Sequence, residues 1–355
     1  MDATNIDLYA NTRHLERLFI LGAGFSCSVS KDFPLTRDLL ERVFDEDKAL
    51  PAMWANLASL FTPFLRAREA SGTPEITSVL TALEAYRAIV GKLGPADAKI
   101  RELQTRVLYG AAALLHRASA ATAGSRLMKD FCDRLDPTRD AILTMNWDVA
   151  PEYELKGRAI GYQYDVLPTV SGADRPEKLL VLKPQGSVTW ARVNPLPNVS
   201  SPVLAVGPPP PAPHWILSER LGAPPTFGNP GPVPSDPAII PPGFIGEERS
   251  RELYWSGYLL RVATYAALQA KKIVVVGYSL PPDDFHILTA LSFGIPQDSW
   301  GDGVEVFVVD PSTSTFQQWR NAFHGLTTRS GKAVSVRHWA PNLEVALQRP
   351  GGPWA

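Results

Sequence analysis

The feature that most constrains the fold is a set of short apolar runs that alternate with helical patterns along the chain. The runs are Arg17–Leu21, Ala141–Met145, Leu179–Lys183, Lys272–Val276 and Val304–Val309. Strands that are apolar along their length, rather than at every second residue, are typical of a parallel sheet buried on both faces. Because helices must cover both faces of such a sheet, the sequence predicts an α/β fold, a Rossmann-like parallel sheet flanked by helices.

Two long segments interrupt this alternation. From 52 to 135 the apolar residues recur at three- and four-residue spacing, which predicts an inserted helical subdomain. Between Pro195 and Pro242 lie 16 of the 33 prolines. Because proline lacks an amide donor and fixes φ, we expect residues 195–245 to be an irregular, Pro-rich excursion. The prediction is a single domain over residues 1–355, with its Rossmann-like core at 17–50 and 136–345.

Composition excludes several classes of protein. Lys plus Arg number 35 and Asp plus Glu 36, so net charge gives no argument for direct nucleic-acid binding, and none is expected. The two cysteines, Cys27 and Cys132, are too few for a zinc site built from cysteines, so no zinc is expected. Few cysteines suit a reducing cytoplasm, and no apolar run is long enough to span a membrane. We therefore expect a soluble, cytoplasmic protein.

A glycine-rich turn follows the first predicted strand. Gly22, Ala23 and Gly24 would let backbone amides approach a diphosphate, and the Ser26 hydroxyl could donate to a phosphate or ribose oxygen. The full dinucleotide fingerprint has a third glycine where this chain has Cys27. Two alternatives stay open: a tight strand–helix turn without a ligand, and a serine that caps the turn.

Polar residues follow several predicted strands. The strands end at or near Gly22, Asn146, Lys183, Gly277 and Asp310. Because open α/β sheets bind ligands beyond the carboxyl ends of their strands, these residues are expected to border one crevice. Asn146 and the nearby Asp148 could both point into it, although such residues at a strand end also form Asx turns.

Several motifs, in order and spacing, resemble one family. They are Gly22-Ala23-Gly24-Phe25-Ser26 with Pro34-Leu35-Thr36, Thr144-Met145-Asn146-Trp147-Asp148, Lys183-Pro184-Gln185-Gly186-Ser187, Ile239-Ile240-Pro241-Pro242, Val276-Gly277-Tyr278-Ser279-Leu280-Pro281 and Val309-Asp310. Together they resemble the sirtuin-like NAD-hydrolysing domains of bacterial antiphage systems, over about Leu18 to Pro311.

The resemblance implies roles for individual residues. It places the NAD diphosphate at Gly22, Ala23, Gly24 and Ser26. It places Asn146 at the nicotinamide ribose, with Asp148 as its companion. It also implies that Gly277 and Ser279 approach the phosphates and the adenosine ribose, and that Asp310 accepts hydrogen bonds from that ribose.

One departure concerns the chemistry. The family normally has histidine where this chain has Gln185, and a glutamine cannot act as a general base near neutral pH. Gln185 could instead position water or ribose, with Asp148 as the carboxylate, if cleavage is largely dissociative. His286 is the nearest alternative base, but a lone histidine in the first turns of a helix is more often structural.

Two functions are therefore expected. The first is an NAD+ glycohydrolase that releases nicotinamide and ADP-ribose as the effector of an antiphage or plasmid defence system, with catalytic residues Asn146, Asp148 and Gln185. The second is a catalytically silent subunit that binds NAD or ADP-ribose. A zinc-dependent deacylase lacks its cysteines here, and no motif supports a dehydrogenase. The resemblance further implies a homo- or hetero-oligomer and a partner that supplies recognition, either a short Argonaute or a hexameric translocase-type ATPase.

Overall fold

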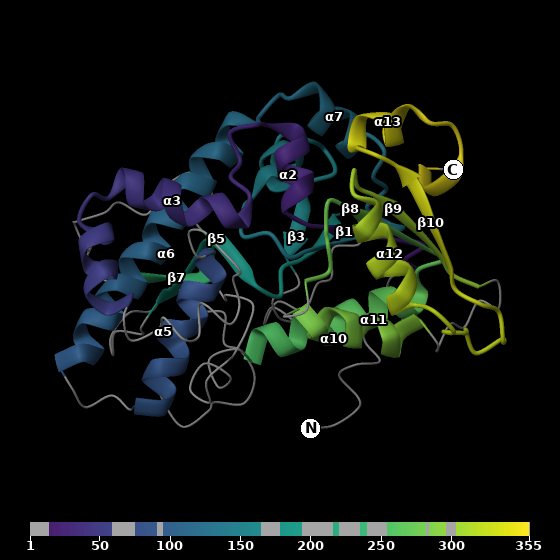
Figure 1. The fold of residues 1–355 in the computed structure, drawn as a ribbon. Helices are drawn as coiled ribbons and strands as arrows, with labels where there is room; N and C mark the ends of the chain where they lie inside the picture. Colours follow the sequence, from purple (N-terminus) through teal and green to yellow (C-terminus); the bar gives the residue numbers. More distant parts are fainter. Residues whose placement is uncertain are drawn as a thin grey trace.

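A seven-stranded sheet runs through the centre of the computed structural model, which describes residues 14–58, 75–90, 95–164, 178–193, 216–219, 235–239, 254–281, 284–295 and 303–354 (Figure 1). The strand order is β10-β9-β8-β1-β2-β4-β3, and every neighbouring pair is parallel. The strands are β1 (Arg17–Leu21), β2 (Asp140–Thr144), β3 (Tyr162–Tyr164), β4 (Leu179–Leu182), β8 (Lys272–Val276), β9 (Glu305–Val309) and β10 (Ser335–Ala340). The predicted Rossmann-like α/β fold is confirmed.

The central strands are buried on both faces because their side chains alternate between two separate apolar cores. Phe19 and Leu21 of β1 belong to one core, whereas Leu18 and Ile20 belong to the other. The first core is closed by α3 (Thr36–Glu46), α5 (Ile76–Val90), α6 (Pro95–Ala121), α7 (Arg126–Cys132), α8 (Ala150–Lys156) and α13 (Leu343–Gln348). The second is closed by α10 (Tyr254–Gln269), α11 (Phe285–Gly294) and α12 (Thr313–Ala322). This is why the strands read as continuous apolar runs.

The chain changes its direction of travel across the sheet at β1 and β8. The connection from β1 to β2 crosses the first face, whereas α11 and α12 connect β8, β9 and β10 across the second face. Strands β1 and β8 pair in register, so that Leu21 lies opposite Val276. The two strands therefore end side by side at a topological switch point, where open α/β sheets form their ligand crevices.

A second, smaller sheet lies within and beside the Pro-rich segment. Its order is β6-β5-β7, antiparallel, with β5 (Gly186–Val193), β6 (Ile216–Glu219) and β7 (Ser235–Ile239). Residues 195–245 were expected to be irregular, and β6 and β7 depart from that expectation. Both are edge strands, where Pro237 needs no ladder partner for its missing amide. The other residues between Pro195 and Pro242 lie outside the described part of the chain.

Most predicted elements are found within a few residues of their expected bounds. The helical pattern after residue 52 gives α5, α6 and α7, although residues 59–74 and 91–94 lie outside the description. Val304–Val309 is the last of the apolar runs found in the sequence, but it is not the last strand, because β10 follows it at the sheet edge. A short helix, α2 (Ala23–Val29), and η4 (Gly352–Trp354) were also not predicted.

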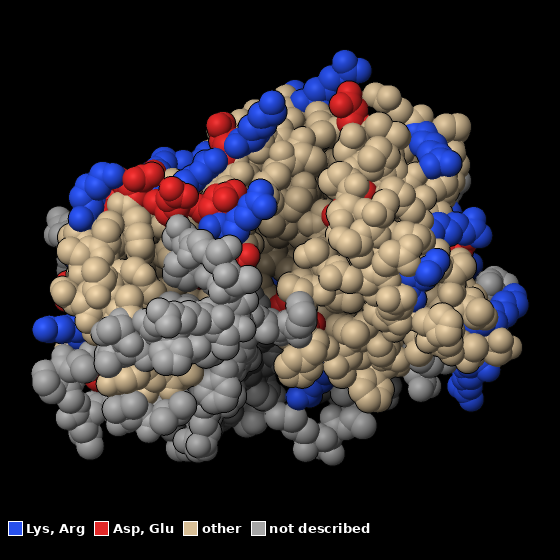
Figure 2. Space-filling view, viewed as in Figure 1, with Lys and Arg blue, Asp and Glu red and all other residues tan. Residues whose placement is uncertain are grey.

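The surface carries both signs of charge close together. Along α3 and α6, Arg106 pairs with Asp47 and Arg117 with Glu46, and the face in Figure 2 shows positive and negative side chains interleaved there. Among the described helices, none has the combination of length and apolar character needed to cross a bilayer.

Candidate functional site

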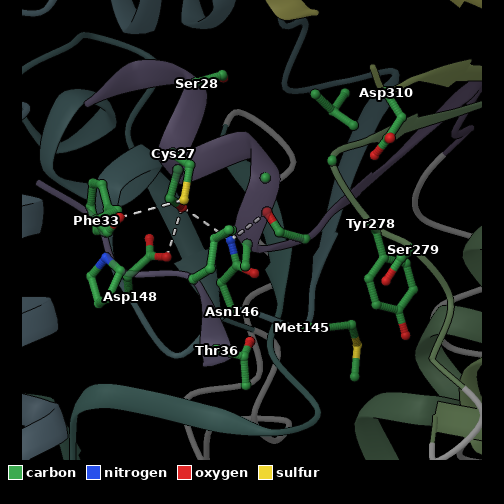
Figure 3. Close-up of a pocket in the computed structure, with 18 of the residues that line it drawn as sticks. Cys27, Ser28, Phe33, Thr36, Met145, Asn146, Asp148, Tyr278, Ser279 and Asp310 are labelled. Atoms are coloured by element: carbon green, nitrogen blue, oxygen red, sulfur yellow. Dashed lines mark hydrogen bonds between the residues drawn. The ribbon is translucent and has the colours of Figure 1, made fainter. Parts of the chain in front are cut away.

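A cavity of about 870 Å³ opens at the carboxyl edge of the sheet, beside the switch point between β1 and β8. Its size falls in the range of small-molecule sites. The ten residues expected from the sequence to be catalytic or to bind the dinucleotide all contribute to its wall: Gly22, Ala23, Gly24, Ser26, Asn146, Asp148, Gln185, Gly277, Ser279 and Asp310. In Figure 3, Asn146 and Asp148 lie across the opening from Tyr278, Ser279 and Asp310.

The glycines are required because two turns pack directly against each other. A Cβ atom on Gly22 would lie 2.6 Å from the Tyr278 Cα, and one on Gly24 would lie 2.9 Å from the Gly277 Cα. Gly277 adopts a φ of 59°, and a Cβ there would overlap the Phe25 nitrogen. The turn after β1 and the turn after β8 are therefore in backbone contact, and side chains are excluded from both.

This packing occupies amides that a diphosphate would otherwise use. The Gly24 amide donates to the Gly277 carbonyl oxygen at 3.0 Å, and the Phe25 amide donates to the Gly22 carbonyl oxygen at 2.9 Å. The Ala23 amide, at the start of α2, has no acceptor among the described residues. The glycines are thus explained by the tight turn itself, and the Ala23 amide remains available to a ligand.

Asn146, Ser26 and Asp148 form one hydrogen-bonded group. The Ser26 hydroxyl donates to Asp148 Oδ2 at 2.7 Å, and Asn146 Nδ2 donates to Ser26 Oγ at 3.1 Å and to the Gly22 carbonyl oxygen at 2.9 Å (Figure 3). Ser26 therefore links α2 to the segment after β2 and does not cap its own helix. Because Nδ2 is committed to the protein, the Asn146 amide oxygen is the atom left for a ligand.

Asp148 also forms the Asx turn that was the alternative to a ligand role. Its Oδ1 accepts from the Ala150 amide at 3.1 Å, which starts α8, and its side chain is almost fully buried. Both carboxylate oxygens thus have donors from the protein. The negative charge is fixed in place at the wall of the cavity, with little freedom to reorient.

Behind Asp148 lies a buried ion pair. Lys183 Nζ is 3.1 Å from Glu152 Oε1, and both side chains are fully buried. The same ammonium donates to the Asp148 carbonyl oxygen at 2.5 Å, and Tyr164 donates its hydroxyl proton to Glu152 Oε1 at 3.2 Å. Burial raises the pKa of Glu152, and the charge of Lys183 opposes this rise. Lys183 was expected to border the crevice, but it is not part of the described cavity wall and instead anchors the backbone that carries Asp148.

Gln185 is held by a carboxyl group that the sequence did not indicate. Gln185 Nε2 donates to Asp284 Oδ1 at 2.7 Å, and the Tyr278 hydroxyl donates to Asp284 Oδ2 at 2.7 Å. All three side chains are buried and all three line the cavity. Burial raises the pKa of Asp284 to about 6, against the two hydrogen bonds, which favour the charged form. No local signal could have joined Gln185 to Asp284, because they are 99 residues apart.

The remaining predicted residues lie at the strand ends. Ser279 is exposed, and Asp310 Oδ1 accepts from the Ser312 amide at 2.8 Å. His286, considered as an alternative base, does not contribute to the described cavity wall. Burial lowers its pKa, and its ring packs against Phe285. The geometry gives His286 no part in the site.

The charges that line the cavity are mostly negative. Among the described lining residues Arg37 is the single cation, whereas Glu75, Asp148, Asp284 and Asp310 are acidic. A negative wall stabilises a ligand or transition state that carries positive charge. No group of three or more histidine, cysteine or acidic residues with metal-binding geometry occurs in the described part of the chain.

Comparisons with known proteins add a likeness of structure only. No protein-family model matches the chain, and no curated protein matches it either. Among solved structures, that of Sir2Tm bound to a propionylated peptide is similar over 98% of this chain and 97% of the other, with 13% sequence identity and a TM-score of 0.34. A TM-score this low carries no information about activity, so the function is argued from the site.

Proposed function

We propose that this chain binds NAD+ in the cavity at the carboxyl ends of β1 and β8 and hydrolyses the bond between nicotinamide and ribose. The observation that carries the proposal is the fixed group of Asn146, Ser26 and Asp148 beside the switch point, in a wall that is predominantly acidic. The motifs that resemble sirtuin-like NAD-hydrolysing domains supply the identity of the ligand.

The chemistry suits a site of this charge. In the hydrolysis, the bond from the anomeric carbon to the nicotinamide nitrogen breaks, and its electron pair leaves with neutral nicotinamide. Water then forms the new bond to the anomeric carbon and releases a proton, which gives ADP-ribose. Because positive charge builds on the ribose as the bond breaks, a fixed carboxylate such as Asp148 lowers the barrier without accepting a proton.

Individual residues would then have distinct tasks. The Asn146 amide oxygen would accept a hydrogen bond from a ribose hydroxyl or from water, since its nitrogen is tied to Ser26 and Gly22. Gln185 would position the water, and the Ala23 amide and Arg37 are the donors available to a diphosphate. Ser279 and Asp310 would lie toward the adenosine half of the ligand.

The wider role follows from the resemblance. We propose that the chain acts in the cytoplasm as the effector of a prokaryotic antiphage or plasmid defence system, in a homo- or hetero-oligomer. A partner of the short Argonaute or hexameric translocase type would recognise the invader, and the depletion of NAD+ would be the outcome.

A catalytically silent NAD or ADP-ribose binding subunit is the second candidate. Two observations favour it: Gln185 cannot take up a proton, and both Asp148 oxygens already accept hydrogen bonds from the protein. Such a subunit would bind the dinucleotide and leave it intact.

The deciding experiment follows nicotinamide and ADP-ribose by chromatography after incubation of the full chain with NAD+, with binding measured in parallel by calorimetry. The key variant is Asn146→Ala, and Asn321→Ala is the matched control, because Asn321 is exposed on α12 and lies outside the cavity wall. Thermal unfolding of each variant shows whether it is folded.

Each outcome selects one candidate. Turnover that is lost in Asn146→Ala and kept in Asn321→Ala establishes the hydrolase. Binding without turnover, by the chain alone and with its partner, establishes the silent subunit. If the folded chain neither binds nor cleaves NAD+, the ligand assignment is wrong.

A further inference from the structure

We propose that Asp284 is a positioning residue: together with Tyr278 it turns the Gln185 side-chain amide so that the amide oxygen faces the cavity, and protonation of Asp284 reverses the amide. This inference rests on the proposed function for its catalytic consequence. Its structural half concerns the free protein and is tested without NAD+.

The ionised form fixes the orientation of the amide. A carboxylate can only accept hydrogen bonds, so Gln185 must present Nε2 to Asp284 Oδ1, as it does at 2.7 Å. The Gln185 amide oxygen is then the free atom of that side chain at the cavity wall. There it can accept a hydrogen bond from a bound water, and a lone pair of that water then points away from the amide and toward the substrate.

The neutral form requires a different arrangement. A protonated Asp284 has one O–H, which must find an acceptor, and the candidates are Tyr278 and Gln185. Tyr278 already donates its only O–H to Asp284 Oδ2 at 2.7 Å, and it has no other acceptor among the described residues. If Asp284 donated to Tyr278, the buried tyrosine proton would lose its partner, and an unsatisfied buried donor is costly.

Reversal of the Gln185 amide avoids that loss. The Gln185 oxygen then accepts from Asp284, Tyr278 keeps its bond, and Nε2 turns to the cavity, where a ligand or water can accept from it. A partly positive NH2 group then faces the place where positive charge develops. The reversal should therefore slow the cleavage step more than it weakens binding of NAD+.

The surroundings make Asp284 the group that titrates. Burial raises the pKa of Asp284 to about 6, while the hydrogen bonds from Tyr278 and Gln185 favour the charged carboxylate and oppose that rise. Burial and Asp284 itself raise the pKa of Tyr278 well above its usual value, so the phenol stays protonated. On the same element, His286 has its pKa lowered by burial, and Asp283 lies outside the described residues.

The first test observes the Gln185 amide directly. The probe is the side-chain NH2 signal of Gln185 in the ¹⁵N-glutamine-labelled full chain, assigned by its loss in Gln185→Glu, and followed from pH 4.5 to 8. We expect the wild-type signal to titrate with a midpoint near the pKa of Asp284, about 6. The titration should vanish in Asp284→Asn and persist in His286→Gln and in Asp130→Asn, an exposed control.

Tyr278→Phe provides a second variant that keeps the ring in the core. Loss of the tyrosine O–H removes a bond that favours the charged carboxylate, so the midpoint should move to higher pH. A Gln185 signal that does not move with pH, or that titrates equally in Asp284→Asn, overturns the proposal. These outcomes do not depend on whether the chain binds NAD+.

The second test concerns the reaction. In Asp284→Asn, Tyr278 holds the asparagine oxygen, so the new NH2 group faces Gln185 and binds its oxygen, as in the protonated wild type. We expect wild-type kcat to rise through about pH 6, whereas the variant has a kcat at least about tenfold lower that no longer rises there, with KM little changed. Equal kcat profiles contradict the proposed role. A wild type that does not cleave NAD+ contradicts the proposed function, while the amide titration still decides the orientation.

Discussion

At the scale of single residues, the site depends on buried charges that sit behind the cavity wall. Lys183 and Glu152 are both fully buried, and Glu152 Oε2 has no hydrogen-bond partner among the described residues. Breaking a buried pair by removing one partner is far more costly than breaking a surface pair, because the other charge remains without compensation. Lys183 therefore holds the Asp148 backbone in place, and its removal should lower the stability of the fold strongly, because Glu152 would be left charged and buried.

Lys183→Met should accordingly destabilise the fold by about 3–5 kcal/mol, measured by chemical denaturation. The control is Arg337→Met, which breaks the exposed pair with Glu305 and should cost about 1 kcal/mol or less. Adding Glu152→Gln to Lys183→Met should recover part of the loss. If Lys183→Met and Arg337→Met lose similar stability, the buried Lys183–Glu152 pair contributes no more to the fold than an exposed pair does.

Asp284 should contribute to the pH dependence of the free energy of unfolding. Because its pKa is raised to about 6 in the folded state, the folded protein binds this proton more tightly than the unfolded chain does. Stability should therefore fall as pH rises from about 4 to about 6, by at most roughly 3 kcal/mol from this group. Glu152 and Asp140 have pKa values raised in the same direction, so the comparison must isolate Asp284.

The isolating measurement is the free energy of unfolding of the wild type and of Asp284→Asn from pH 4 to 8. The variant should lose less stability than the wild type between pH 4 and 6, and the two curves should run parallel above pH 7. Curves that run parallel over the whole range would show that Asp284 titrates normally.

At the scale of elements, the contact between the turn after β1 and the turn after β8 sets the shape of the cavity. Gly277→Ala should destabilise the protein by roughly 3 kcal/mol or more, because a Cβ would overlap the Phe25 nitrogen and the φ of 59° is also strained. Gly325→Ala is the matched control: its φ is 76°, and nothing lies within 4 Å of its Cβ.

The control should lose only about 1–2 kcal/mol, the cost of the positive φ alone. Thermal and chemical denaturation of the two variants give the comparison. If Gly277→Ala and Gly325→Ala lose the same stability, the close contact between the two turns is absent in solution.

The same elements show what the sequence could predict. β1, β2, β4, β8 and β9 were found because strands buried on both faces must be apolar throughout, which is a local property. β10 was missed because it lies at the sheet edge, where polar residues such as Arg337 and His338 are exposed in its Ser335–Ala340 run. Its place in the sheet depends on β9, and nothing local records that pairing.

The residues of the candidate site likewise include some that local sequence indicates and others whose role depends on tertiary contacts. Gly22, Asn146 and Gly277 were found from their positions at strand ends, and all three line the cavity. Asp284 was missed as a functional residue because its importance comes from a contact with Gln185 across 99 residues. Likewise, no local pattern indicates that Lys183 reaches back to the carbonyl of Asp148, since that contact exists only once β2 and β4 pair.

At the scale of the whole molecule, the cavity joins the parts of the chain on either side of the switch point. Its wall takes residues from the ends of β1, β2, β8 and β9. A ligand that binds only the folded state stabilises it by about 2.7 kcal/mol at a concentration one hundred times its dissociation constant. For a chain of 355 residues, this corresponds to a rise in Tm of roughly 4 °C.

We expect such a rise with ADP-ribose, which is not consumed, and little rise with nicotinamide alone, because the smaller ligand reaches only one side of the switch point. Scanning fluorimetry over a range of ligand concentrations gives the measurement. An equal rise in Asn146→Ala would show that ADP-ribose binds elsewhere on the molecule.

The placement of the adenosine half also predicts a preference between dinucleotides. If Asp310 lies near the adenosine ribose, its carboxylate repels the 2′-phosphate of NADP+, and like charges at about 6 Å interact by roughly 3 kcal/mol at an effective dielectric constant near 20. Allowing for screening, we expect NADP+ to bind about tenfold more weakly than NAD+. Asp310→Asn should narrow this gap, because an amide oxygen can still accept from the Ser312 amide while the charge is gone.

Calorimetry with both dinucleotides, on the wild type and on Asp310→Asn, tests this placement, with Asp130→Asn on α7 as the exposed control. The ratio of the two affinities is the informative quantity, since a general loss of stability would weaken both ligands alike. A wild type that binds NADP+ as tightly as NAD+, or a ratio unchanged in Asp310→Asn, would mean that the adenosine ribose lies away from β9. The ligand would then run across the switch point in a different direction, with its diphosphate no longer beside the Ala23 amide and Arg37.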